Sequence, residues 1–226
     1  MVHEAAEMRR EYFDVSHLTL GTQWGGSDAI SGITANSVVG VVADRVVEQG
    51  GTVILPEPLE WIGTESLLAA RMPNEVVRQQ FEVLMNEYLT ILVGGQREQI
   101  PERLIAPGNI EGGLTTIEEK SLGNIAKGGT SPIEGLVRYA DKPPRSGLWL
   151  MVGPAVDVPS MVGVAAAGAQ AIIMTTGRGS PTGIPVSPVL KVCGNPDTCN
   201  WLRANIDVNA SRIITDDLSV NAVGRE

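Results

Sequence analysis

The 226-residue sequence is poor in histidine and in clustered positive charge. Its two histidines, His3 and His17, stand close together at the N-terminus, which gives little support for a histidine-rich metal site or a Ser-His-Asp relay. The 17 Lys and Arg residues face 26 Asp and Glu residues and form no basic block, so neither nucleic acid nor an anionic membrane is an expected partner. No apolar run approaches the roughly 20 residues that a membrane-spanning helix needs. The composition therefore predicts a soluble globular protein.

Cysteine is also scarce. Cys193 and Cys199 are too few for a disulfide framework, and their spacing matches neither a CxxC redox pair nor a zinc knuckle. We expect two reduced thiols that pack as small apolar side chains. The N-terminal segment MVHEAAEMRREYF is charged where a secretory signal would be apolar, which predicts a cytoplasmic chain.

Short apolar segments that alternate with helical patterns predict an α/β fold, with a mainly parallel, Rossmann-like sheet and flanking helices. The strand candidates lie at 17–21, 52–55, 148–152, 171–175 and 189–192. Helical patterns occupy 38–49, 77–88 and 115–127. A long Pro/Gly-rich loop at 94–113 and a linker at 141–147 flank a helical middle section. We therefore divide the chain into sub-parts 1–92, 93–146 and 147–226.

Ligands of open parallel sheets collect at the carboxyl ends of the strands, so the turns after each strand are informative. Two such turns, 22–28 and 176–180, are rich in glycine and could point backbone N–H groups at an anion. Tight turns that need a positive φ are the alternative. Arg178, between two glycines, could hold a carboxylate through two parallel hydrogen bonds or lie on the surface as an ordinary arginine.

Three glutamates, Glu57, Glu60 and Glu65, follow the strand candidate at 52–55. Their oxygens could hold a divalent cation or supply a catalytic base. Glu60 and Glu65 could equally be acidic residues in the first turn of a short helix, where the helix dipole favours them.

The segment 109–129 combines a Gly-Gly pair, two threonines and a charged helix start. Lys120 and Lys127 are the positive charges nearest to these features in the sequence and could meet an anionic substrate. Solvated helix charge is the alternative explanation.

Three segments in one order carry a family resemblance: 25–36 (GGSDAISGITAN), 111–129 (EGGLTTIEEKSLGNIAKGG) and 175–183 (TTGRGSPTG). Together they resemble the altronate/galactarate dehydratase family, which also includes the large subunit of sulfolactate sulfo-lyase. The similarity extends over 18–211 and concerns the C-terminal portion of the family. The family's N-terminal SAF domain has no counterpart in this sequence. We therefore expect a SAF-domain subunit or a further N-terminal region as partner, and a homo-oligomer.

The resemblance implies a lyase that removes water, or sulfite, from a hydroxy or sulfo acid and leaves a 2-keto acid. A sugar acid such as altronate or galactarate is the expected substrate, and iron(II) is the expected cofactor. Glu57, Glu60, Glu65 and Lys120 would be catalytic, with Glu57 and Glu60 as metal ligands. The implied substrate-binding residues are Ser27, Asp28, Asn36, Thr115, Thr116, Thr176, Arg178 and Ser180.

Two alternatives to a sugar-acid dehydratase remain open. The segment 192–196 (VCGNP) looks more like the sulfolactate branch, which favours cleavage of a carbon–sulfur bond. Trp24 stands where family members often carry cysteine, directly before the Gly-Gly-Ser-Asp motif, which favours a module that binds an acid without turnover. A metal titration would separate the enzyme from the binding module.

Overall fold

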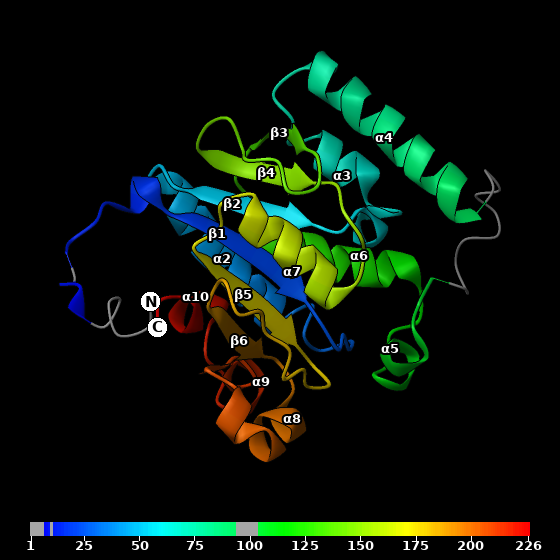
Figure 1. Cartoon of the computed structure of the whole chain (residues 1–226). Coiled ribbons are helices and arrows are strands. Elements are labelled where there is room, and N and C mark those ends of the chain that lie inside the picture. Colours follow the sequence, from blue (N-terminus) through cyan, green and yellow to red (C-terminus); the bar gives the residue numbers. More distant parts are fainter. Residues whose placement is uncertain (1–6, 10, 94–103) are drawn as a thin grey trace.

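The structure is a computed structural model that describes residues 7–9, 11–93 and 104–226. Within these residues, seven parallel strands form one sheet in the order β3-β4-β2-β1-β5-β6-β7 (Figure 1). The strands are β1 (Thr19–Trp24), β2 (Thr52–Pro56), β3 (Ile133–Val137), β4 (Gly147–Met151), β5 (Ala171–Thr176), β6 (Val189–Cys193) and β7 (Val208–Asn209). The predicted α/β fold with a parallel sheet is confirmed.

Helices connect and cover these strands. The α-helices are α2 (Ala35–Glu48), α3 (Glu65–Ala69), α4 (Glu75–Val93), α5 (Pro107–Glu111), α6 (Ile117–Ile125), α7 (Asp157–Ala166), α8 (Pro196–Trp201), α9 (Arg212–Thr215) and α10 (Val220–Gly224). Short 3-10 helices lie at η1 (Val15–His17), η2 (Pro58–Trp61), η4 (Ala126–Gly128) and η5 (Arg203–Asn205).

Both faces of the sheet are buried, which explains why its strands are continuous apolar runs instead of alternating ones. In β2, Val53 and Leu55 belong to the larger core, which includes Val39 of α2. Ile54 between them belongs to the second core, which includes Val164 of α7. Helix α2 therefore covers one face and α7 the other (Figure 1).

The order of the strands reverses at β1. The chain passes from β1 through α2 to β2 on one side, and later from β4 through α7 to β5 on the other side. In a doubly wound sheet, such a switch point opens a crevice at the carboxyl ends of the two diverging strands. The segments that follow β1, β2 and β5 therefore meet beyond the carboxyl ends of these central strands.

Several sequence predictions need correction. The first strand is Thr19–Trp24 rather than 17–21, so Gln23 and Trp24 lie in the strand and not in the turn after it. The middle section is not purely helical, because it contributes β3 at the edge of the sheet. The predicted linker at 141–147 joins β3 to β4, which pair with each other, so strands from all three sub-parts lie in one sheet.

The N-terminal part of the predicted loop at 94–113, residues 94–103, lies outside the described residues, and its remaining part contains α5. The sequence prediction also missed α7. The helix accommodates Pro159 because a proline is tolerated in the first turn of a helix, where the N–H group has no partner within the helix.

Cys193 and Cys199 are free and buried, as predicted. Across the described residues, no helix combines the length and the apolar character needed to cross a membrane.

Candidate active site

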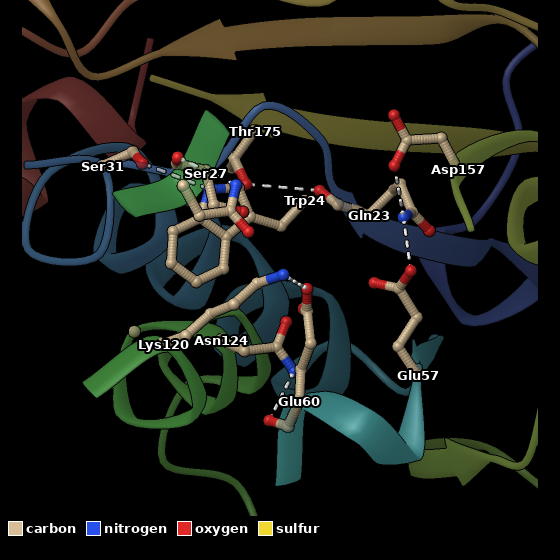
Figure 2. Close-up of polar contacts among 12 residues, drawn as sticks. Gln23, Trp24, Ser27, Ser31, Glu57, Glu60, Lys120, Asn124, Asp157 and Thr175 are labelled. Carbon is tan, nitrogen blue, oxygen red and sulfur yellow. Dashed lines mark hydrogen bonds and ion pairs between the residues drawn. The ribbon is translucent and has the colours of Figure 1, made fainter. Parts of the chain in front are cut away.

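Charged side chains gather where β1 and β2 end, beside the start of α7 and the inner face of α6 (Figure 2). Hydrogen bonds join one set of these residues, ion pairs join the other, and charge interactions link the two sets, which we together call the carboxylate–lysine cluster. Its members are Gln23, Glu57, Glu60, Lys120, Lys127 and Asp157.

Gln23 connects two carboxylates that come from different elements. Its side chain is fully buried near the end of β1. The amide Nε2 donates to Glu57 Oε1 at 2.8 Å and to Asp157 Oδ1 at 3.3 Å, as Figure 2 shows. One amide group therefore fixes the orientation of a carboxyl group after β2 and of another at the start of α7.

Glu57 has an unusual backbone conformation. It lies between Pro56 and Pro58 with φ 76° and ψ 77°, in the left-handed region. Proline at the next position disfavours the right-handed helical region, and a non-glycine residue in the left-handed region costs on the order of 1–3 kcal/mol. Strain of this kind persists where the surroundings hold it, and it concentrates at functional sites. The conformation directs a side chain that is only 2% exposed toward Gln23.

Glu60 lies between two lysines. Its Oε1 is 3.0 Å from Lys120 Nζ, and its Oε2 is 4.0 Å from Lys127 Nζ. Lys127 is fully buried, and the Glu60 side chain is 3% exposed. Asn124 Nδ2 donates to the Glu60 carbonyl at 3.2 Å. Residues 120, 124 and 127 share one helical face because they are spaced by four and three, and this face packs on η2.

The environment drives the proton affinities of these groups apart. Burial raises the pKa of Glu57 well above its ordinary value, and the nearby Glu60 carboxylate adds to the shift. Burial also lowers the pKa of Lys127, although Glu60 opposes this change. Burial alone would lower the Lys120 pKa, but the attraction of Glu60 raises it overall. Burial thus favours the protonated form of Glu57, and Glu60 favours the charged form of Lys120.

Several buried atoms of this cluster have no hydrogen-bond partner among the described residues. The acceptors are Gln23 Oε1, Glu57 Oε2, Glu60 Oε2 and the neighbouring Asn124 Oδ1, and the donor is Lys127 Nζ. A buried polar group without a partner costs about 1–3 kcal/mol, and most such groups in folded proteins are satisfied. Because donors and acceptors without partners are concentrated here, a polar ligand could supply the missing hydrogen bonds.

The predicted glycine-rich loops also come together, next to this cluster. Backbone bonds join them, because Gly177 N and Arg178 N both donate to Gly26 O. Asp28 is buried and accepts from Ser31 N at 2.8 Å and from Asn195 Nδ2 at 2.9 Å. A Cβ atom on Gly177 would overlap the Asp28 carboxylate, so this position requires glycine.

The hydroxyl groups of these loops bond within the protein. Thr176 Oγ1 accepts from Gly179 N at 2.9 Å, and Ser180 Oγ donates to Thr182 Oγ1 at 3.0 Å. The Ser27 carbonyl accepts from Asn109 Nδ2 at 3.2 Å, and the Ser27 side chain is buried. The predicted substrate-binding roles of Ser27, Thr176 and Ser180 stay predictions, and their described contacts shape the loops.

Arg178 lies at the rim of the site. Its side chain is 37% exposed, and its Nη2 is 2.8 Å from Glu111 Oε2, which is itself 68% exposed. An exposed ion pair of this kind contributes about 0–1 kcal/mol, so Glu111 can release Arg178 to an incoming carboxylate at little cost.

Four other predicted residues lie apart from the cluster's hydrogen bonds. Thr116 is the N-cap of α6, and Glu119 Oε2 accepts from Thr115, so both threonines serve helix capping. Asn36 is buried in α2 and donates to Gly123 O at 2.8 Å. Glu65 begins α3 and lines a separate hollow together with Phe81 and Met85. The sequence-predicted roles of these residues remain predictions.

The sequence prediction gave no site role to Gln23, Asn124 and Asp157, and it considered Lys127 only as a charge that could meet an anionic substrate. A signal for Asn124 existed in its helical spacing from Lys120 and Lys127. Gln23 was expected in the informative turn at 22–28 but received no role of its own, and it lies in β1.

Trp24, which stands in the place of a family cysteine, is buried. Its Nε1 donates to Ser31 Oγ at 3.1 Å, and its ring lies against Gly123. The side chain therefore fills the space between β1 and α6.

The predicted metal site does not fit the residues that the structure brings together. Over 7–9, 11–93 and 104–226, no group of three or more His, Cys, Asp and Glu side chains is placed to hold a metal ion. Glu60 already faces two lysines, which supply positive charge without a metal. Glu57 and Glu60 as metal ligands stay a prediction, and the chemistry below takes no step through a metal.

Comparison with known sequences decides the family. The sequence model described as "D-galactarate/Altronate dehydratase, C-terminal" matches residues 15–226. The chain belongs to this dehydratase family. The resemblance carried by its three glycine-containing motifs is thereby confirmed.

Curated relatives of this family member include three bacterial enzymes. The (2R)-sulfolactate sulfo-lyase subunit beta of Chromohalobacter salexigens is 38% identical over 99% of this chain and 58% of its own length. Altronate dehydratase of Bacillus subtilis is 37% identical over 100% of this chain and 45% of its own length. Galactarate dehydratase (L-threo-forming) of Escherichia coli is 35% identical over 96% of this chain and 41% of its own length. The chain therefore spans about half the length of the relatives that it matches.

Proposed function

We propose that this chain carries the carboxylate–lysine cluster of a lyase that eliminates water from a hydroxy carboxylic acid and leaves a 2-keto acid. The observation that carries the proposal is the buried carboxyl groups of Glu57 and Glu60 at the carboxyl end of the sheet. Each keeps one oxygen without a hydrogen-bond partner among the described residues, and Glu60 is paired with Lys120 and Lys127. The family relatives that are named as altronate and galactarate dehydratases support a sugar acid as substrate.

The reaction requires removal of a proton from the carbon next to a carboxylate. This step leaves negative charge on the carboxylate oxygens, and fixed positive groups stabilise that charge. We assign proton removal to the Glu57–Glu60 pair, in which burial favours the protonated form of Glu57 and Glu60, paired with Lys120, accepts the substrate proton. Lys120, which keeps its positive charge, would then balance the developing enediolate.

Arg178 is suited to a different part of the substrate. A partly exposed guanidinium on a glycine-rich loop can bind a carboxylate with two parallel hydrogen bonds. We propose that Arg178 holds the substrate carboxylate at the rim, while the buried charges act on the reacting carbons.

A second candidate substrate is (2R)-sulfolactate, with sulfite as the leaving group. The sulfo-lyase subunit of Chromohalobacter salexigens, at 38% identity over 99% of this chain, favours it. That relative is named as a subunit, which supports a partner subunit for the present chain as well.

The test is an anaerobic assay of 2-keto acid formation by the complete protein, with any partner subunit, from galactarate, altronate and (2R)-sulfolactate. Each acid is tested with and without added iron(II). The Glu60→Gln variant should lower kcat by roughly 10²- to 10⁴-fold, which is the usual contribution of general acid–base catalysis.

The matched control is Glu48→Gln, an exposed glutamate at the far end of α2. It should leave kcat unchanged. Binding of the acids without any product would contradict the enzyme and favour the binding module.

A further inference from the structure

Asp157 is a carboxylate of the cluster that sequence motifs did not reveal. It follows β4 as the first residue of α7, and Gln23 binds its Oδ1 at 3.3 Å. The same amide binds Glu57 at 2.8 Å. Asp157 is therefore attached to the buried carboxylate pair through a shared hydrogen-bond donor (Figure 2).

The second oxygen of Asp157 lies against the glycine-rich loop. A Cβ atom on Gly25 would overlap Asp157 Oδ2, so only glycine allows the carboxyl group to approach the main chain this closely. Gly25 opens the same loop that carries Ser27 and Asp28. Asp157 consequently stands between the buried cluster and the loop that was expected to bind substrate.

Exposure separates Asp157 from its two neighbours. The side chains of Glu57 and Glu60 are almost fully buried, at 2% and 3% exposed, whereas Asp157 is only partly buried. A carboxyl group in this position can meet a substrate that enters from the loop side. It can also exchange its proton with solvent between turnovers.

We propose that Asp157 is a third catalytic carboxyl group of this site and that it donates a proton to the leaving hydroxyl group of the substrate. The inference rests on the proposed elimination. The Glu57–Glu60 pair first removes the proton next to the carboxylate and leaves the enediolate. The electrons of the broken C–H bond then form a carbon–carbon double bond to the neighbouring carbon. The C–O bond breaks at the neighbouring carbon, and its oxygen takes the Asp157 proton and leaves as water.

The remaining protons balance without a further reactant. The enol that is left takes up a proton at carbon, releases the proton of its hydroxyl group and becomes the 2-keto acid. Asp157, now a carboxylate, regains a proton from solvent, and the carboxylate pair returns the one it removed. The net change is the loss of one water molecule.

The surroundings of Asp157 agree with a proton donor. Burial raises its pKa above the ordinary value, the Gln23 hydrogen bond opposes this change, and the Glu60 carboxylate adds to it. A neutral carboxyl group is therefore more populated here than at an exposed aspartate.

The decisive variant is Asp157→Asn, which keeps the size of the side chain and an acceptor for Gln23 but cannot donate an acidic proton. With a hydroxy-acid substrate in D₂O, NMR follows two events: exchange of the proton next to the carboxylate, and formation of the keto acid. We expect kcat for elimination to fall roughly 10²- to 10⁴-fold while proton exchange persists. The control is Asp197→Asn, an exposed aspartate in the first turn of α8, which should change neither event.

The outcomes separate the two proposals. Normal elimination by Asp157→Asn would overturn the role of Asp157 while leaving the proposed function intact. Loss of both exchange and elimination would assign Asp157 to proton removal and overturn its role as donor. Absence of turnover in the unsubstituted protein would count against the proposed function itself.

A measurement without turnover then decides the role of Asp157. Carbon-13 NMR of the protein labelled at aspartate, with Asp157→Asn to assign the signal, reports whether Asp157 holds a proton at a pH where exposed aspartates are ionised. An ionised Asp157 under these conditions would overturn the proposal, and a protonated one supports it.

Discussion

Two buried or half-buried carboxylate sites of this protein are built in opposite ways. Asp44 of α2 accepts hydrogen bonds from the backbone and hydroxyl groups of Thr130 and Ser131, all between 2.6 and 2.9 Å. Glu57 and Glu60 each keep one oxygen without a partner among the described residues. A carboxylate whose oxygens all accept hydrogen bonds anchors a loop. A carboxyl group that keeps an oxygen without a partner, at the carboxyl ends of the strands, is available for chemistry.

The Asp44 anchor has a clear structural purpose. It binds the loop that leads from η4 into β3, and Arg71 holds the same loop through Gly128 O and Ser131 O. This loop ends the segment that carries Lys120 and Lys127. The hydrogen-bonded Asp44 site thus helps to position the lysines of the carboxylate–lysine cluster.

Substitution of Glu57 by glutamine should give an effect as large as that of Glu60→Gln, because glutamine cannot pass a proton within the pair. We expect kcat to fall roughly 10²- to 10⁴-fold. The free energy of unfolding should not decrease at neutral pH, because glutamine resembles the protonated carboxyl group that burial favours here. Product assays and urea unfolding of the same preparations would check this. If Glu57→Gln lowered the free energy of unfolding as well as kcat, Glu57 would have a structural role like that of Asp44, and the distinction between the two sites would be wrong.

The reverse pattern is expected for Asp44→Ala. Loss of the charged acceptor should reduce the free energy of unfolding by about 2–3 kcal/mol, since it leaves several loop donors without their partner. The kcat of the folded variant should stay within about twofold when assayed below its unfolding temperature. A large drop in kcat of a fully folded sample would show that the anchor and the cluster are coupled.

A smaller effect is expected at the rim, where Arg178 forms its exposed ion pair. Arg178→Lys should raise KM about tenfold, which corresponds to about 1.4 kcal/mol, because lysine cannot form two parallel hydrogen bonds to a carboxylate. The fold should be intact, and Glu111→Gln serves as the control that removes only the ion-pair partner. An unchanged KM in the active assembly would refute the carboxylate-binding role.

The pH dependence of stability should have opposite signs at the two sites. Burial works to raise the pKa of Asp44, but the hydrogen bonds from Ser131 and Thr130 outweigh it and lower the pKa overall. Its contribution is therefore present above the unfolded-state pKa and is lost as pH falls through the folded-state pKa. Glu57 has a raised pKa, so its contribution is present below its ordinary value of 4.5 and is lost as pH rises through the folded-state pKa.

Urea unfolding at several pH values would measure these trends. The stability advantage of the unsubstituted protein over Asp44→Asn should shrink toward acid pH. Relative to the unsubstituted protein, Glu57→Gln should gain stability as pH rises above 4.5. Parallel curves for all three proteins would mean that neither carboxyl group changes its proton affinity on folding.

Sequence patterns predicted the parts of this site that depend on neighbouring residues. The strand candidates at 52–55 and 171–175 fall on β2 and β5, so Glu57 and Arg178 were correctly expected just beyond strand ends. The helical spacing around Lys120 predicted α6 within two residues at each end. Gln23 and Asp157 received no predicted role. Gln23 was assigned to a turn although it lies in β1, and Asp157 begins α7, which the local pattern did not indicate.

The sequence by itself determined the parallel sheet, the helices and the glycine-rich turns, because apolar periodicity and glycine act over a few residues. Only the tertiary structure decided which carboxyl oxygens have hydrogen-bond partners and which have none among the described residues. Asp44 meets a loop 86 residues away, and Gln23 meets Asp157 across 134 residues. Burial, hydrogen bonding and charge pairing at such separations depend on how η2, α6 and α7 pack against the sheet, and no local pattern encodes that packing.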